Sequence, residues 1–127
     1  MNAGCDILLI EDSASQALRV QLLLQRAGYQ VDVATDGEAG WHAAYTHSPR
    51  LILLDIDLPK LNGFQVLSRL KRGQQTRHIP VVMLTNREHV SHVLQSLELG
   101  ADDYLPKPDM PTHIQTVVEQ FLEPSDS

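Results

Sequence analysis

The feature that most constrains the fold is a set of three short, uninterrupted apolar runs. Each run has four residues without any alternation between apolar and polar side chains, and a polar residue follows it directly. Strands of this kind are typical of a parallel sheet that helices cover on both faces. The runs span residues 7–10, 51–54 and 81–84, and the polar residues that follow them are Glu11, Asp55 and Thr85.

Helical patterns separate these runs. Residues 13–27 are rich in Leu, Gln, Ala and Arg, with Ser13 as a helix N-cap and Gly28 as a stop signal. Two later segments place apolar residues at i, i+3, i+4 and i+7, as an amphipathic helix does. Further helices are therefore predicted at 90–99 and 114–122, less regular ones at 37–46 and 63–71, and weaker strands at 29–34 and 102–105.

The strand and helix patterns alternate five times, which predicts one α/β domain. Parallel neighbours need a long crossover, and one helix between successive strands supplies it. Right-handed crossovers give a doubly wound five-stranded parallel sheet with helices on both faces, whereas periodicity leaves the strand order open. We expect residues 1–122 to form this domain and residues 123–127 to be a polar tail or the start of a linker.

Composition narrows the class of protein. A length of 127 residues suits one domain, and a single cysteine, Cys5, cannot form an internal disulfide, as is typical of the reducing cytoplasm. No apolar run approaches the roughly 20 residues of a membrane span, and no signal peptide is evident. Sixteen acidic and ten basic residues give a net charge of −6, which disfavours nucleic-acid binding. We expect a cytoplasmic domain with no membrane insertion and no direct nucleic-acid contact.

Polar residues that follow the strands are expected to meet at one edge of the sheet, where open α/β sheets bind ligands. Two carboxylates about 7 Å apart repel by roughly 2 kcal/mol at an effective dielectric near 20, so such a cluster raises a pKa or holds a cation. An acidic pair such as Glu11 and Asp12 is also common at helix N-termini where no ligand binds. The prediction of a site therefore depends on the complete set of polar residues. The set comprises Glu11, Asp12, Asp55, Asp57, Thr85 and Lys107.

The types of residue in this set indicate phosphoryl chemistry. Carboxylate and carbonyl oxygens without His or Cys favour a hard ion, Mg²⁺ or Mn²⁺. A divalent ion, an ammonium and a hydroxyl are the groups that neutralise a phosphoryl group during transfer. An aspartate beside them can be the nucleophile and become an aspartyl phosphate.

Four stretches of the sequence, taken together, resemble the receiver domain of bacterial two-component response regulators. The resemblance covers about residues 5–122, and within the family the chain resembles chemotaxis-type stand-alone receivers. It implies a flavodoxin-like fold with the strand order 2-1-3-4-5. The stretches are ILLIEDS at 7–13, LILLDIDLP at 51–59 followed by Asn62 and Gly63, PVVMLT at 80–85, and GADDYLPKP at 100–108.

The resemblance also implies a role for each residue of the set. Asp55 would be the phosphoacceptor, Lys107 would pair with Asp55 and then with its phosphate, and Thr85 would donate its hydroxyl to the phosphoryl group. Tyr104 would turn inward as Thr85 moves, and the bond from Lys107 to Pro108 would be cis. The Mg²⁺ ligands, with Mn²⁺ as the other possible ion, would be Asp12, Asp55, the backbone carbonyl of Asp57 and, through a water molecule, Glu11.

The implied function is a phosphorylation-dependent switch that is not a metabolic enzyme. A sensor histidine kinase or a histidine phosphotransfer protein would donate the phosphoryl group, and the domain would hydrolyse it slowly. An effector would bind the face made by the fourth helix, the fifth strand and the fifth helix. Two residues depart from the family, because Asn86 replaces a small residue and Asp109 replaces a common Phe. We hypothesise that Asn86 alters phosphoryl exchange.

Two other classes of function fit parts of this pattern. A phosphohydrolase of the haloacid-dehalogenase type also has Asp-x-Asp after an apolar strand, here at 55–57. Three features oppose it: Pro59 stands where that motif has Thr or Val, an acidic pair precedes the nucleophile strand, and Lys107 comes after the late Asp pair. A receiver-like module that binds partners without phosphorylation is disfavoured by the complete set of site residues.

Overall fold

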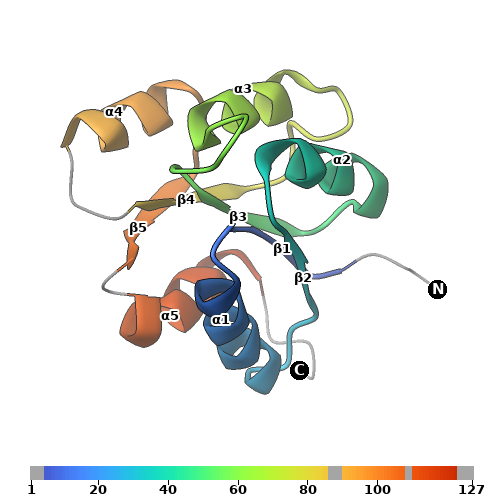
Figure 1. Ribbon diagram of the computed structural model, residues 1–127, viewed down its shortest axis with the longest axis vertical. Coiled ribbons are helices and arrows are strands. Elements are labelled where there is room, and N and C mark those ends of the chain that lie inside the picture. The colour runs from blue at the N-terminus through green and yellow to red at the C-terminus, as the bar shows by residue number, and fades with distance from the viewer. Residues whose placement is uncertain (1–4, 86–89, 108–109, 123–127) are drawn as a thin grey trace.

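The three apolar runs form the three central strands of a parallel sheet (Figure 1). The structure, a computed structural model, describes residues 5–85, 90–107 and 110–122. Every paired strand is parallel, and the order β2-β1-β3-β4-β5 confirms the order that the resemblance implies. The strands are β1 (Ile7–Ile10), β2 (Val31–Ala34), β3 (Leu51–Asp55), β4 (Val81–Thr85) and β5 (Asp103–Pro106).

Five helices cover the two faces of the sheet. Figure 1 shows α1 and α5 below the sheet and α2, α3 and α4 above it, as a doubly wound fold requires. No helix in the described part of the chain is long and apolar enough to cross a membrane. The helices are α1 (Ala14–Arg26), α2 (Gly37–His47), α3 (Gly63–Arg72), α4 (Val90–Glu98) and α5 (Met110–Phe121).

Alternate residues of the central strands build two separate cores. Leu8 and Ile10 pack with residues of α2 and α3, whereas Ile7 and Leu9 pack with residues of α1 and α5. Because successive side chains of a strand point to opposite faces, a sheet covered on both sides needs apolar residues at every position. This is the physical reason for the uninterrupted runs in the sequence.

Local signals fix the helix starts near the carboxyl ends of the strands. Ser13 caps α1, as predicted, and its side chain accepts a hydrogen bond from the backbone N–H of Gln16. Asn62 caps α3 in a reciprocal capping box with Gln65. Caps of this kind satisfy backbone N–H groups that the first helical turn leaves unpaired. They hold α1 and α3 in place directly beside the ends of β1 and β3.

Candidate functional site

Strand register brings four of the predicted site residues to the same edge of the sheet: Glu11, Asp55, Thr85 and Lys107. Ile10 pairs with Leu54 and Thr85 pairs with Pro106, so the residues that end or follow these strands emerge together. Glu11, Asp55 and Thr85 are buried, with at most 2% of each residue exposed. Burial of three polar side chains is costly unless each has a hydrogen-bond or charge partner, so their contacts define the chemistry of this edge.

Three carboxylates form the centre of this edge. Glu11, Asp12 and Asp55 each offer one oxygen, and these oxygens lie within 4.8 Å of one another. Glu11 and Asp55 are buried, whereas Asp12 is exposed to solvent. The sequence predicted this grouping from the ends of β1 and β3, and the structure brings all three residues together.

One ammonium lies between the two buried carboxylates. Lys107 Nζ is 3.0 Å from Asp55 Oδ2 and 3.1 Å from Glu11 Oε1, and the lysine side chain is 12% exposed. Glu11 Oε1 has this ion pair but no well-directed hydrogen bond within the described residues. The other oxygen, Glu11 Oε2, accepts a hydrogen bond from the backbone N–H of Ser13 at 3.1 Å.

The charges and burial of the cluster shift the pKa of two of its groups, Asp55 and Lys107. Burial and then the charge of Glu11 raise the pKa of Asp55 to about 6, although Lys107 and the backbone N–H of Asp57 act in the opposite direction. Burial lowers the pKa of Lys107, but the hydrogen bonds and charges of Asp55 and then Glu11 outweigh it, and the net direction is upward. Ionisation of Asp55 therefore costs more free energy in the folded protein than in an ordinary exposed aspartate.

These residues fit a divalent cation. Three ionised carboxylates and one ammonium leave two negative charges at the cluster, and the oxygen Glu11 Oε1 lacks a directed donor. An all-oxygen set at this spacing suits a hard ion such as Mg²⁺ or Mn²⁺, which tolerates water in its remaining positions. A bound cation would neutralise the charge that Lys107 leaves uncompensated.

The structure also places three other predicted residues, of which Asp57 contacts the cluster directly. Asp57 is exposed, and its backbone N–H donates to Asp55 Oδ1 at 3.1 Å. Thr85 is buried at the end of β4. Tyr104 lies on β5 and is 38% exposed. Asn86, Asp109 and the bond from Lys107 to Pro108 lie outside the described residues, so the expectations about them stay predictions.

Two residues near the acidic cluster were not among the predicted site residues, although Ser13 was predicted as a helix cap and Gly63 belongs to one of the matching stretches. The N–H of Ser13 orients Glu11, and Gly63 packs against the backbone of Asp55. A Cβ atom at Gly63 would lie 2.4 Å from the carbonyl oxygen of Asp55, so only glycine fits there. The Asn62-Gly63 pair after β3 is visible in the sequence, but the close approach to Asp55 that requires glycine exists only in the folded structure.

The late Asp pair of the phosphohydrolase alternative does not reach this edge. Asp102 Oδ2 lies 3.1 Å from Lys71 Nζ and accepts a hydrogen bond from the N–H of Val81, the first residue of β4. Asp102 therefore lies at the amino end of the sheet, opposite Asp55. This placement removes one of the carboxylates that the phosphohydrolase interpretation needs in the site.

Comparisons with known proteins agree with the geometry. The family model described as the response regulator receiver domain matches residues 7–119. The alkaline phosphatase synthesis transcriptional regulatory protein PhoP of Bacillus subtilis is 40% identical over 120 residues, which are 94% of this chain and 49% of that protein. The DNA-binding dual master transcriptional regulator RpaA of Synechocystis is 44% identical over 102 residues, which are 80% of this chain and 42% of that protein. The chain thus spans about half the length of the curated relatives it matches.

Solved structures give the same result. Chemotaxis protein CheY4 of Vibrio cholerae is 28% identical with a TM-score of 0.87, covering 94% of this chain and 100% of that one. The receiver domain of sensor histidine kinase PA1611 from Pseudomonas aeruginosa, solved with a magnesium ion in its active-site cleft, is 28% identical with a TM-score of 0.84 and coverages of 94% and 98%. The Mn²⁺-bound form of response regulator Rcp1 is 32% identical with a TM-score of 0.79 and coverages of 92% and 94%.

The fold, the acidic cluster and the family match all agree. The sheet order is that of a flavodoxin-like α/β protein, and the three carboxylates occupy its carboxyl edge. This chain belongs to the family of response regulator receiver domains.

Proposed function

We propose that this domain is a phosphorylation-dependent signalling switch in which Asp55 accepts a phosphoryl group. The observation that carries the proposal is the position of Asp55, a buried carboxylate 3.0 Å from Lys107 Nζ within the acidic cluster. A sensor histidine kinase or a histidine phosphotransfer protein is the donor. Residues 1–122 form the receiver, and residues 123–127 are its tail or the start of a linker.

Phosphoryl transfer from phosphohistidine to Asp55 exchanges one bond for another. A carboxylate oxygen of Asp55 forms the new bond to phosphorus as the bond from phosphorus to the imidazole nitrogen breaks. The bonding electrons return to that nitrogen, and a ring protonated on its second nitrogen leaves as neutral imidazole. The attack needs an ionised carboxylate, and a pKa of about 6 leaves Asp55 ionised above pH 7.

Residues of this chain hold the carboxylate and receive the product. The N–H of Asp57 and the ammonium of Lys107 each bind one oxygen of Asp55, which fixes the plane of the carboxylate. Lys107 then binds the transferred phosphoryl group, and the Thr85 hydroxyl donates to it. Mg²⁺ or Mn²⁺, held by Glu11 through water, Asp12, Asp55 and the backbone carbonyl of Asp57, supplies positive charge to the phosphoryl oxygens when bound.

The switch follows from the charge that phosphorylation adds. A phosphoryl group brings about −1.5 to −2 charge at neutral pH. The Thr85 hydroxyl can contact the phosphoryl group only when Asp55 is phosphorylated. A contact that exists in one conformation and not in the other shifts the equilibrium between the two conformations. Tyr104 turns inward as Thr85 moves. Exposed Leu94 and Leu97 on α4 and Tyr104 on β5 support α4, β5 and α5 as the face that an effector binds.

The domain does not act as a metabolic enzyme in this proposal. It catalyses its own phosphorylation and hydrolyses its phosphate slowly. We expect it to act in the cytoplasm, where a phosphohistidine made from ATP is available, without inserting into a membrane. The names of PhoP and RpaA describe transcriptional regulators, but this domain has a net charge of −6 and we expect no direct DNA contact from it.

The test is covalent labelling with a small phosphodonor. The chain is incubated with Mg²⁺ and acetyl phosphate or phosphoramidate, and the intact mass is measured with time. We expect one added phosphate that survives acid and is lost in base, and no adduct on Asp55→Asn or after chelation of the metal. Asp103→Asn, which changes a carboxylate outside the cluster, is the matched control and should label normally.

Each alternative gives a different result in the same assay. Rapid turnover of many donor molecules without a lasting adduct would support a phosphohydrolase. The absence of any adduct, with a folded protein, would support a receiver-like module that works without phosphorylation. An adduct that persists on Asp55→Asn would contradict the assignment of Asp55.

A further inference from the structure

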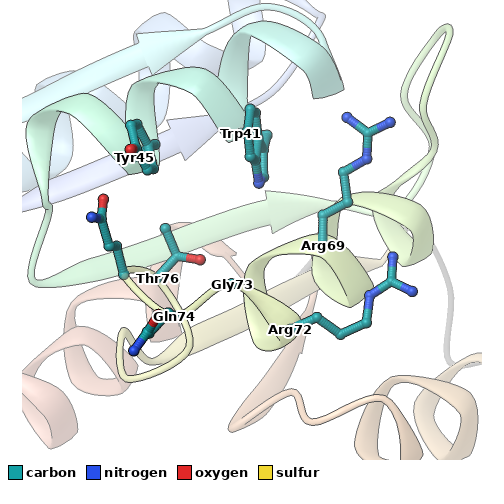
Figure 2. A pocket seen from close by; sticks show the side chains of 8 residues that line it. Trp41, Tyr45, Arg69, Arg72, Gly73, Gln74 and Thr76 are labelled. Atoms are coloured by element: carbon teal, nitrogen blue, oxygen red, sulfur yellow. The ribbon is translucent and has the colours of Figure 1, made fainter.

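Two of the helices that cover one face of the sheet, α2 and α3, are separated at one end and meet closely at the other. Toward the amino edge of the sheet, a pocket of about 500 Å³ lies between them (Figure 2). Figure 2 shows two aromatic side chains projecting from α2 toward α3. The pocket is lined by Trp41 and Tyr45 of α2, by Arg69 and Arg72 of α3, and by the segment 73–76.

The aromatic side chains of this pocket have partners within the chain. Tyr45 stacks on Trp41 with 6.0 Å between the ring centroids, and the Arg69 guanidinium lies 5.8 Å from the centroid of the Trp41 ring. These contacts join α2 to α3 at the open end of their interface. Because Trp41 is the only tryptophan of the chain, its fluorescence reports the position of α2 relative to α3.

At the carboxyl edge, the first residue of α2 lies directly against the loop that joins β3 to α3. A Cβ atom at Gly37 would lie 2.5 Å from the carbonyl oxygen of Leu61, 2.9 Å from Leu61 Cβ and 2.7 Å from Val66 Cγ2. Gly37 is buried, and it is not among the glycines with a positive φ. The close approach of the loop, and not the backbone conformation of α2, is therefore the reason for glycine at this position.

The same loop, residues 56–62, orients the proposed phosphoacceptor. The backbone N–H of Asp57 donates to Asp55 Oδ1 at 3.1 Å. The two ends of the loop are joined, because the N–H of Gly63 donates to the carbonyl oxygen of Ile56 at 2.8 Å. A displacement in the middle of the loop therefore changes the path of the backbone between these ends, which includes Asp57.

The position of the loop is imposed by its surroundings. Lys60 has φ +66°, a left-handed conformation that is strained for a residue with a side chain and persists only where neighbouring contacts enforce it. Lys60 Nζ also lies 3.9 Å from Oδ2 of Asp36, which caps α2. Toward the sheet, a Cβ atom at Gly40 would lie 2.5 Å from Ile10 Cδ1, so α2 is already packed closely on β1. A side chain added at Gly37 would therefore displace the loop and not the helix.

We propose that Gly37 is a positioning residue for the phosphorylation of Asp55. The start of α2 sets the path of the loop 56–62, and the loop in turn sets the place of the Asp57 backbone. That backbone supplies the N–H that orients the Asp55 carboxylate, and its carbonyl is the expected ligand for Mg²⁺. The inference rests on the proposed function of Asp55, and it gives a functional role to a helix start outside the acidic cluster.

The test compares Gly37→Ala with the parent chain in three measurements. With acetyl phosphate and saturating Mg²⁺, the rate of adduct formation should fall about tenfold, because the carboxylate is no longer held in one orientation. In NMR spectra of the metal-free protein, the Asp57 N–H resonance should move upfield and its hydrogen exchange should become about fivefold faster. The fluorescence emission of Trp41 should stay unchanged, because α2 keeps its place beside α3.

Gly73→Ala is the matched control. A Cβ atom there would lie 2.5 Å from Thr76 Oγ1, at the far end of α3 from the loop 56–62. This variant should lose stability but keep the labelling rate and the Asp57 resonance of the parent. If Gly37→Ala does not fold, the same comparison is made in the Lys60→Gly background, where glycine lets the loop move aside from the added methyl group.

Three results would overturn the proposal. One is a labelling rate in Gly37→Ala equal to that of the parent, and another is an equal loss of rate in Gly73→Ala. The third is a shifted Trp41 emission with an unchanged Asp57 resonance, because the helix and not the loop would then have moved. Failure of the proposed function is distinguishable, since a parent chain that takes up no phosphate contradicts Asp55 while the metal-free Asp57 resonance still tests Gly37.

Discussion

The two edges of the sheet each hold a lysine in an ion pair, but the two lysines have opposite surroundings. At the amino edge, Lys71 Nζ donates to the carbonyl oxygens of Arg77 and Ile79, at 3.3 and 2.9 Å, and pairs with Asp102 at 3.1 Å. At the carboxyl edge, Lys107 Nζ contacts only the carboxylates of Glu11 and Asp55 among the described residues. The side chains are 17% and 12% exposed, so burial does not distinguish them.

The difference lies in how the charges are balanced. Around Lys71, one ammonium meets one carboxylate and two carbonyls, and Asp102 also accepts the N–H of Val81 at 2.8 Å. This network is satisfied and holds α3, β4 and β5 together. Lys107 pairs with two carboxylates of a cluster of three, and the excess negative charge favours binding of a cation. The amino edge therefore stabilises the fold, whereas the excess charge at the carboxyl edge opposes folding when no cation is bound.

The largest predicted effect is a steric one at the carboxyl edge. In Gly63→Ala the new Cβ atom would meet backbone atoms, 2.4 Å from Asp55 O and 2.6 Å from Ile56 Cα. Neither neighbour can rotate away, so we expect a loss of about 3 kcal/mol in the free energy of unfolding, measured by urea denaturation. Ser68→Ala in the same helix is the control and should change stability by less than about 0.5 kcal/mol. A loss in Gly63→Ala no greater than in this control would contradict the close approach.

The second prediction concerns the charge of Asp55. Its pKa is about 6 in the folded protein, against 3.8 ordinarily, so the folded state loses stability as pH rises from about 4 through 6. We expect Asp55→Asn to be more stable than the parent by about 2–3 kcal/mol at pH 8 without divalent ions, and equal to it near pH 4. Urea unfolding at both pH values, in chelator, measures this. A variant less stable than the parent at pH 8 would mean that Lys107 balances the cluster fully.

The third prediction compares the stability lost on replacing each of the two lysines, Lys71 and Lys107. Lys71→Met removes the ammonium that pairs with Asp102 and donates to two carbonyls, and Lys107→Met leaves carboxylates without their cation. Each variant should therefore lose about 2 kcal/mol in the absence of divalent ions. Excess Mg²⁺ should restore stability to Lys107→Met and not to Lys71→Met, because among the described residues it is the carboxyl edge that brings three carboxylates together. Thermal unfolding with and without Mg²⁺ makes the comparison. Equal responses of the two variants to Mg²⁺ would show that the edges do not differ as described.

The smallest effect is expected at the amino edge. Gly100 has φ +103°, and a Cβ atom there would lie 3.1 Å from Lys71 Cγ. A lysine stem can shift, so the cost of Gly100→Ala is mainly backbone strain of about 1 kcal/mol. Gly100→Asn should cost less than Gly100→Ala, because asparagine tolerates a left-handed backbone better. The reverse order in urea denaturation would show that side-chain crowding against Lys71 dominates.

Much of the fold and the acidic cluster could be predicted because they depend on local pattern. Uninterrupted apolar runs require a sheet covered on both faces, and parallel strands then deliver Glu11, Asp55 and Thr85 to one edge. The strand order, which the family resemblance supplied and periodicity could not, places β4 between β3 and β5. The contact of Lys107 with both buried carboxylates therefore depends on the reach of the lysine side chain as well as on the strand order. The predicted helix 114–122 begins earlier, at Met110, because its first turn, MPTH at 110–113, lies outside the i, i+3, i+4 apolar pattern from which it was predicted.

The pocket between α2 and α3 could not be predicted in the same way. Trp41 packs partly against the core and also lines the pocket. Arg69 and Arg72 look like an ordinary solvated helix end in the sequence. Only the packing of α2 against α3 brings these residues opposite the aromatic rings. The role of Gly63 was hidden for the same reason.

Chemical mapping of the phosphorylated residue tests the central claim most directly. After labelling with acetyl phosphate and Mg²⁺, reduction with borohydride converts an aspartyl phosphate to homoserine, which peptide mass spectrometry locates. We predict homoserine at position 55 alone, and only when Mg²⁺ is present during labelling. Homoserine at position 12 or 57, or none at all in a protein that carries a phosphate, would contradict Asp55 as the phosphoacceptor.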